Sequence, residues 1–233
     1  MTRVALLVLV AVAGLATAGG SNAAAVTGGC TSGAPAGYTY AGHRADAVSQ
    51  GVRATITPLA APQVAAGHVA AWVGVGGPGD GPGGTDEWLQ VGIASLSSGT
   101  LFVYAETERN GEQPDVTTLR ASVRAGESHR VAIAALGNRS DRWRVWVDGT
   151  PAGEPVLLPG SSGRWKPIAT AESWSAKRTV CNSFAFRFDQ VEVRSSGSWR
   201  PFVSEQRFVD RGDVLRAVDH PGAVTFGFVA RSR

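Results

Sequence analysis

Apolar and polar residues alternate along much of this chain in short runs that end at Gly, Pro or Asp. In residues 51–57, for example, Val52, Ala54 and Ile56 alternate with polar residues. A period of two is typical of a strand with one buried face. Similar strand-like runs are residues 117–124, 128–135, 142–148, 150–158, 184–193, 207–216 and 224–231. Because no helical period extends beyond a turn or two, the pattern predicts an all-β fold with two antiparallel sheets packed as a sandwich.

The stretch of residues 68–108 contains three further strand-like runs, joined by a Gly/Pro-rich loop and a short turn. Gln90 lies inside the apolar second run, and Glu106 lies on the third. A polar amide within an apolar run has two interpretations. Alternation places Gln90 on a solvent-facing side, or Gln90 faces a cleft and holds a ligand.

The first residues of the chain have the pattern of an export signal. A basic start is followed by an apolar segment of about a dozen residues and an A-x-A cleavage pattern ending at Ala18. This segment is too short to span a bilayer stably, and no later segment is long or apolar enough to do so. We therefore expect a signal peptide (1–18), a flexible leader (19–37) and one domain (38–233) of a secreted, extracellular protein without a membrane span.

Cysteine count and charge limit the other functions. Cys30 and Cys181 are the two cysteines, and an even count in an exported protein favours one disulfide. The four histidines are scattered without ligand spacing, so we expect no metal site. The net charge is only +3 and no basic run is present, so we expect no nucleic-acid partner. A monomer is expected.

Several segments resemble the eqolisins, a family of glutamic endopeptidases. The matching segments are W-V-G-V-G-G (residues 72–77), L-Q-V-G-I (89–93), Y-A-E (104–106) and A-E-S-W (171–174). Weaker matches extend the resemblance loosely over residues 38–230, as in a divergent member of actinobacterial type. The resemblance implies a concanavalin A-like jelly roll.

The same resemblance implies a chemistry and its residues. It assigns catalysis to Gln90 and Glu172, and a supporting role around the substrate to Trp72 and Glu106. A carboxylate can take a proton from water as general base and return it to the leaving amine, while a carboxamide can donate a hydrogen bond to the developing oxyanion. The implied activity is cleavage of a polypeptide substrate at acidic pH, without a cofactor.

The sequence also departs from the family pattern. Gly76, Phe102 and Ser175 replace acidic residues that the family carries near its catalytic pair. The chain is therefore either an active peptidase or a domain that kept the fold and lost the chemistry. In the second case, the seven tryptophans favour a carbohydrate- or wall-binding module with a polysaccharide partner.

Overall fold

A computed structural model describes residues 37–109, 112–175, 182–202, 205–210, 215–219 and 226–232. The expected signal peptide and all but the last residue of the expected leader lie outside these ranges, as do Cys30 and Cys181. The export signal and the disulfide therefore stay predictions. Among the described residues, no helix is both long enough and apolar enough to cross a membrane.

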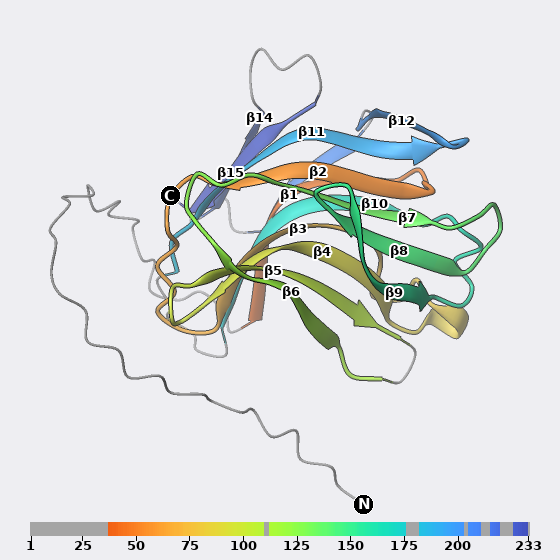
Figure 1. The fold of residues 1–233 in the computed structure, drawn as a ribbon, viewed down its shortest axis with the longest axis horizontal. Helices are drawn as coiled ribbons and strands as arrows, with labels where there is room; N and C mark the ends of the chain where they lie inside the picture. The colour runs from red at the N-terminus through yellow and green to blue at the C-terminus, as the bar shows by residue number, and fades with distance from the viewer. Residues whose placement is uncertain are drawn as a thin grey trace, which may run out of the picture.

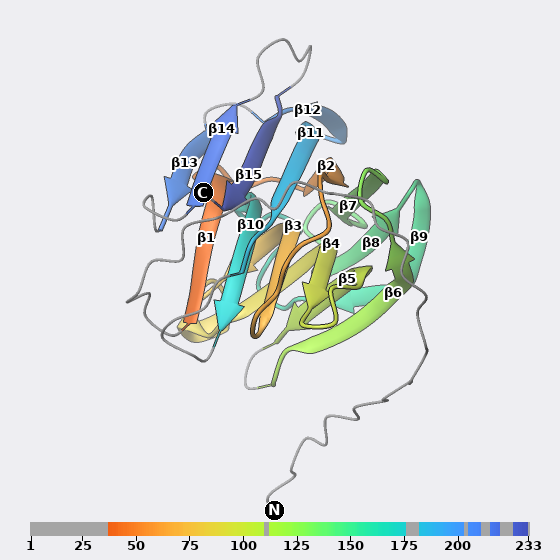
Figure 2. The ribbon, with the colours of Figure 1, turned by 90° about the vertical axis from the view of Figure 1, so that its left-hand side faces the viewer.

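The described chain forms two antiparallel sheets packed face to face, which confirms the predicted all-β sandwich (Figures 1 and 2). The only helical segment in the described chain is a 3-10 turn, η1 (Pro82–Gly84). The seven-stranded sheet has the order β13 (Glu205–Val209), β1 (Gly37–Ala45), β10 (Pro167–Ser175), β3 (His68–Gly77), β4 (Glu87–Leu96), β5 (Leu101–Glu108) and β6 (Asp115–Val123). The eight-stranded sheet has the order β14 (Leu215–Asp219), β15 (Phe228–Ser232), β11 (Ala185–Ser195), β2 (Gly51–Pro58), β7 (His129–Ala135), β8 (Arg142–Val147) and β9 (Thr150–Leu157), and β12 (Ser198–Pro201) pairs with β11.

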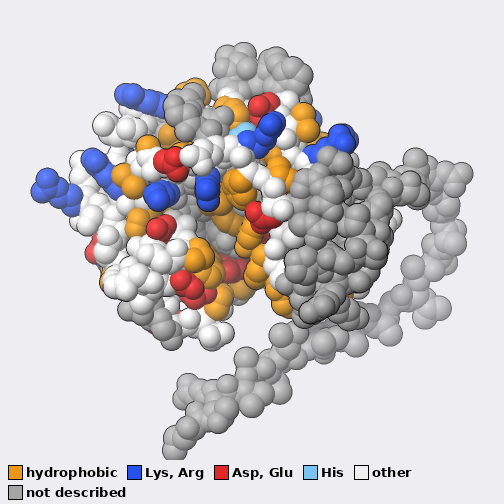
Figure 3. Space-filling model, turned by 180° about the vertical axis from the view of Figure 1, so that it is seen from behind, with side chains coloured by type: hydrophobic (Ala, Val, Ile, Leu, Met, Phe, Trp, Pro, Cys, Tyr) orange, Lys and Arg blue, Asp and Glu red, His pale blue; other side chains and the backbone are white. Residues whose placement is uncertain are grey.

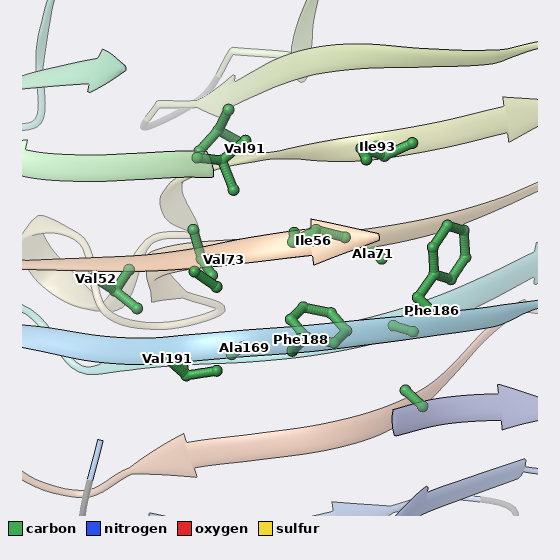
Figure 4. Close-up of a cluster of buried hydrophobic side chains, with 14 of the residues drawn as sticks. Val52, Ile56, Ala71, Val73, Val91, Ile93, Ala169, Phe186, Phe188 and Val191 are labelled. Atoms are coloured by element: carbon green, nitrogen blue, oxygen red, sulfur yellow. The ribbon is translucent and has the colours of Figure 1, made fainter. Parts of the chain in front are cut away.

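The core lies between the two sheets, as the alternating pattern predicts. Figure 4 shows Ile56 and Phe188 from one sheet pointing toward Val73, Val91 and their neighbours from the other. All four side chains have no measurable exposure to solvent. Burial of large apolar side chains, at roughly 25 cal/mol per Å², is the main force that holds the layers together.

One predicted strand is wrong. Residues 207–216 were expected to form a single strand, but the chain there belongs to two strands, β13 and β14, in different sheets. β13 pairs with β1, whereas β14 pairs with β15. Asp210, Gly212 and Asp213 are turn-forming residues, and such residues favour a break at this point over a continuous strand.

Strand register decides which side chains reach the outer face of the seven-stranded sheet. Gln90 on β4 lies opposite Gly74 on β3 and opposite Glu106 on β5. Glu172 on β10 lies opposite Ala70 on β3. Because side chains alternate between the faces of a strand, all of these positions point away from the core. The sheet thus carries a second, outward row of side chains that the sandwich core does not bury.

Candidate functional site

A cleft of about 560 Å³ lies on the outer face of the seven-stranded sheet. This face turns away from the viewer in Figure 1 and is seen in Figure 3, where hydrophobic side chains surround a hollow that contains acidic ones. Its lining includes aromatic and acidic side chains, one arginine and one amide, namely Tyr38, Tyr40, Arg44, Trp72, Asp86, Trp88, Gln90, Glu106, Glu172, Phe208 and Asp210.

Gln90 projects into this cleft from the middle of β4. Its side chain is only 6% exposed, so the interpretation of Gln90 as an ordinary solvent-facing residue does not hold. The amide nitrogen donates to the Tyr104 hydroxyl at 3.0 Å and to a Glu106 carboxylate oxygen at 3.3 Å. Trp88 donates its indole N–H to the other oxygen of Glu106 at 3.2 Å. The amide is thus held in one orientation by its neighbours on β5.

Glu172 enters the same cleft from β10. It is 4% exposed, and one carboxylate oxygen lies 3.2 Å from Nε2 of His68. The His68 ring stacks on Trp174 at a centroid distance of 5.6 Å. Tyr40, opposite Glu172 on β1, packs edge-on against Trp72. A buried carboxylate keeps its place only when polar or charged groups surround it, and His68 supplies such a group here.

The structure brings Gln90, Glu106, Trp72 and Glu172 together around one cleft. Along the strands, the Gln90 and Glu172 positions lie on either side of the row formed by Trp72, Gly92 and Tyr104. Trp72 on β3 stands between them, whereas Tyr104 on β5 lies beside Gln90 on the side away from Glu172. The Tyr104 hydroxyl accepts from Gln90, and the pKa of Tyr104 is raised well above the ordinary value by burial and then by the charges of Glu172 and Glu106.

Glu106 has a raised pKa as well. Burial is the main cause, and the negative charge of Glu172 is the next; the Trp88 hydrogen bond opposes both. Two carboxyl groups that share one poorly solvated site cannot both ionise easily. Glu106 therefore stays neutral to a higher pH than an ordinary Glu side chain.

The sequence did not assign a role to the polar partners of the two candidate residues, Tyr104 beside Gln90 and His68 beside Glu172. Tyr104 sits in an apolar run, L-F-V-Y, that resembles a core strand. The signal that could have found it is parity: Tyr104 is two positions before Glu106 and so shares its face. The same parity relates His68 to Trp72 on β3.

The arrangement can perform acid–base chemistry without any other group. The Glu172 carboxyl group and the Gln90 amide line the cleft, and the Tyr104 phenol, whose raised pKa keeps it protonated, bonds to that amide. In the described part of the chain, no three His, Cys, Asp or Glu side chains gather closely enough to hold a metal ion. A carboxylate in this setting can activate water, while the amide and phenol can stabilise negative charge on oxygen.

Comparisons with known proteins connect this site to a fold. No protein-family model matches the chain, and no curated protein matches it. Solved structures do match. Scytalido-glutamic peptidase with a transition-state analogue inhibitor superposes with a TM-score of 0.53 and 18% identity over 84% of this chain and 97% of that chain.

A second solved structure gives the same result. SCP-B, a member of the eqolisin family of peptidases in complex with the tripeptide Ala-Ile-His, superposes with a TM-score of 0.52 and 21% identity over 83% of this chain and 97% of that chain. At such identities the likeness concerns the fold. The chain has the concanavalin A-like sandwich of the eqolisins.

Proposed function

We propose that this protein is a secreted acid endopeptidase that hydrolyses peptide bonds with Gln90 and Glu172. The observation that carries the proposal is that these two buried polar side chains, from strands separated by β3, line one cleft on an eqolisin-like fold. The two similar peptidase structures contain a transition-state analogue inhibitor and a tripeptide, respectively. A peptide is therefore the substrate class that we assign to this cleft.

Glu172 acts as the general base. Its carboxylate removes a proton from water as the water oxygen attacks the carbonyl carbon of the scissile bond. The same proton then passes to the amide nitrogen as the carbon–nitrogen bond breaks, so the carboxylate is regenerated. His68, 3.2 Å from one Glu172 oxygen, fixes the orientation of that carboxylate and leaves the other oxygen for water.

Gln90 and Tyr104 stabilise the oxyanion. The Gln90 amide carries two hydrogens, and these point to Tyr104 and Glu106. The bond to Glu106 is the longer one, at 3.3 Å, so a substrate oxygen can replace it while the Tyr104 bond keeps the amide in place. Tyr104 accepts from Gln90, which leaves its own hydroxyl hydrogen to donate, and its raised pKa keeps that hydrogen bound.

Acidic conditions suit this site. A neutral Glu106 places no negative charge beside the oxygen that becomes anionic, and the raised pKa of Glu106 extends the pH range of its neutral form. Acid also unfolds protein substrates and protonates the leaving amine. We therefore expect activity to fall as the pH rises toward neutrality.

The alternative is a module that binds carbohydrate or cell wall without catalysis. The observation that favours it is the replacement of the family's acidic residues by Gly76, Phe102 and Ser175, which leaves the catalytic pair with fewer supporting groups. The two tryptophans that line the cleft, Trp72 and Trp88, are evidence against carbohydrate binding at this site. Trp72 is only 7% exposed, and Trp88 is half-buried with its indole N–H bonded to Glu106, so neither offers a free ring face for stacking on a sugar.

The test is cleavage of a denatured protein by purified residues 19–233 between acidic and neutral pH. Glu172→Gln keeps the shape of the side chain and removes the base, so it should abolish turnover. Gln90→Ala removes an oxyanion donor and should lower kcat about 100-fold or more. Ser122→Ala, far from the cleft beside Arg124, is a matched control and should cut like wild type. Absence of cleavage by wild type at every pH would leave the binding module as the better account.

A further inference from the structure

A second groove lies on the other sheet of the sandwich. Its volume is about 220 Å³, and it lies on the outer face of the eight-stranded sheet, over β2, β7 and β8. The catalytic cleft lies on the seven-stranded sheet. The floor consists of two small residues of β7, Ala132 and Ala134. Trp146 on β8 and Trp199 on β12 line it with aromatic rings. Both rings are half-buried, so each presents part of its surface to a ligand.

Three arginines complete the lining of this groove, namely Arg53, Arg130 and Arg194. The acidic residue paired with them is Glu192, which lies 2.6 Å from Nε of Arg53 and 3.1 Å from Nη2 of Arg130. Three positive charges against one negative charge leave an excess of positive charge. The groove is therefore complementary to an anion.

The guanidinium groups are held in fixed positions but keep donors for a ligand. The Arg53 guanidinium lies over the Trp199 ring at 4.3 Å from its centroid, a cation–π geometry, and binds Glu192 through Nε. Arg194 donates from Nη1 to the Ala135 carbonyl. Each guanidinium has five N–H donors in a planar fork, so donors remain that can bind a carboxylate in pairs.

The chemistry of the groove identifies its ligand. Aromatic side chains pack against the apolar faces of sugar rings, whereas arginine guanidinium groups bind carboxylates through paired hydrogen bonds. A volume of about 220 Å³ is smaller than the roughly 300–1,000 Å³ of sites that enclose a whole drug-sized ligand, so it suits one ring of a longer chain. We propose that this groove binds a uronic acid unit of an acidic polysaccharide.

Such a site would hold the protein on an acidic polysaccharide while leaving the other face free. The two sites lie on opposite sheets and share no lining residue. The proposal therefore does not depend on the peptidase function, and each can fail without the other.

The test is calorimetric titration of purified residues 19–233 with galacturonate oligosaccharides. The fully methyl-esterified oligosaccharide, which has the same rings without the charges, is the matched ligand control, and polyglutamate supplies charge without rings. We expect binding of the free acid that weakens with added salt, because exposed charges are screened. The methyl ester and polyglutamate should bind at least about tenfold more weakly, a difference of ~1.4 kcal/mol.

Variants separate this groove from the catalytic cleft. Trp199→Ala and Arg194→Gln should each weaken binding of the free acid at least about tenfold, with unchanged far-UV circular dichroism. If Trp199→Ala fails to fold, Arg194→Gln and Trp146→Ala carry the test. Glu172→Gln should bind the oligosaccharide like wild type. Equal binding of acid and ester, tighter binding of polyglutamate, no binding at all, or full binding by folded groove variants would overturn the proposal.

Discussion

Glu106 is the residue whose protonation has the clearest consequence for the cleft. Its pKa is raised mainly by burial and then by the charge of Glu172. It also touches Gln90 and Trp88 directly. When Glu106 loses its proton as the pH rises, a negative charge appears beside the amide and the Tyr104 hydroxyl that would stabilise an oxyanion. That charge opposes the reaction.

Replacement of Glu106 by Gln should therefore change the pH profile more than the maximal rate. The substitution mimics the neutral form at every pH, so activity at acidic pH should stay within about tenfold of wild type. The fall in kcat/KM toward neutral pH should move to higher pH. The measurement is a pH–rate profile of both proteins on one peptide substrate. A profile of unchanged shape would show that Glu106 does not limit the wild type.

Glu87 is an unusual buried acid at the start of β4. Its side chain is 0% exposed, and neither carboxylate oxygen has a hydrogen-bond partner among the described residues. Its pKa is raised by burial first and by Asp141 second, while Arg109 opposes the shift. A raised pKa means that the folded protein favours the protonated form. Stability is then complete below the ordinary Glu pKa and decreases as the pH rises through the folded-state value.

Replacement of Glu87 by Gln should relieve this pH-dependent cost. At neutral pH the variant should melt at a higher temperature than wild type, because Gln cannot ionise. At pH 3 to 4 the difference should become small or reverse, since wild-type Glu87 is then protonated. Thermal unfolding at the two pH values measures both. A variant that gains no relative stability between acidic and neutral pH would contradict the burial of an ionisable Glu87.

Individual site residues were predictable only in part. Alternation along β4 left two interpretations of Gln90 open, a side chain that faces bulk solvent and one that faces a cleft. The cleft around Gln90 is formed with residues of other elements, such as Tyr40, Trp72 and the loop near Pro78, and these contacts cannot be read from β4 alone. Interactions such as His68 with Glu172 join residues far apart in the chain, and no local pattern reports them.

At the scale of elements, the clearest success is the β8–β9 hairpin. Asp148-Gly149, between the expected runs at residues 142–148 and 150–158, is a sequence typical of a tight hairpin turn, and both residues adopt positive φ angles, 52° and 81°. Trp143 and Val145 are two positions apart and so share a face of β8, and both lie in the core. The strand at residues 207–216 was wrong because its apolar alternation outweighed the turn-forming residues between its two halves.

Gly92 allows β3 and β4 to pair closely beneath the cleft. It lies on β4 between Trp72 on β3 and Tyr104 on β5. A Cβ at this position would meet the Ala71 carbonyl oxygen and, at 2.6 Å, both Cα and Cβ of Trp72. Contacts with backbone atoms cannot relax cheaply. The absence of a side chain at Gly92 therefore lets β3 and β4 pair closely beside Trp72.

Replacement of Gly92 by Ala should destabilise the fold by about 1–3 kcal/mol, the usual cost of overpacking. Gly137→Ala is the matched control, because its added Cβ would meet only the Ser140 side chain at 3.6 Å. Denaturant unfolding of both variants measures the difference. Equal stability of the two variants would show that β3 and β4 separate easily at this point.

At the scale of the molecule, the order of strands brings the site together. β10 follows β9 in the chain but inserts between β1 and β3, and so carries Glu172 toward Gln90 on β4. Composition and alternation predicted the sandwich but not this order, because pairing of distant strands depends on tertiary packing. Only the resemblance to eqolisins linked the two residues before the structure did.

The pairing of Cys30 with Cys181 is a prediction that concerns the whole chain. A disulfide would close a loop of about 150 residues and stabilise the fold by roughly 4–5 kcal/mol, less any strain. The exported protein should show no free thiol in a denatured thiol titration, and a reducing agent should lower its melting temperature. Two free thiols would contradict the bridge.

The central claim is that Gln90 and Glu172 act as a unit on one substrate. The most direct measurement is a double-mutant cycle on kcat/KM for a single acid-soluble peptide, with Gln90→Ala, Glu172→Gln and the combined variant. Groups that work together in one transition state show strongly non-additive losses. We expect Glu172→Gln alone to cost as much as the double variant. Losses that simply add, or a Glu172→Gln enzyme that retains wild-type kcat/KM, would contradict the account.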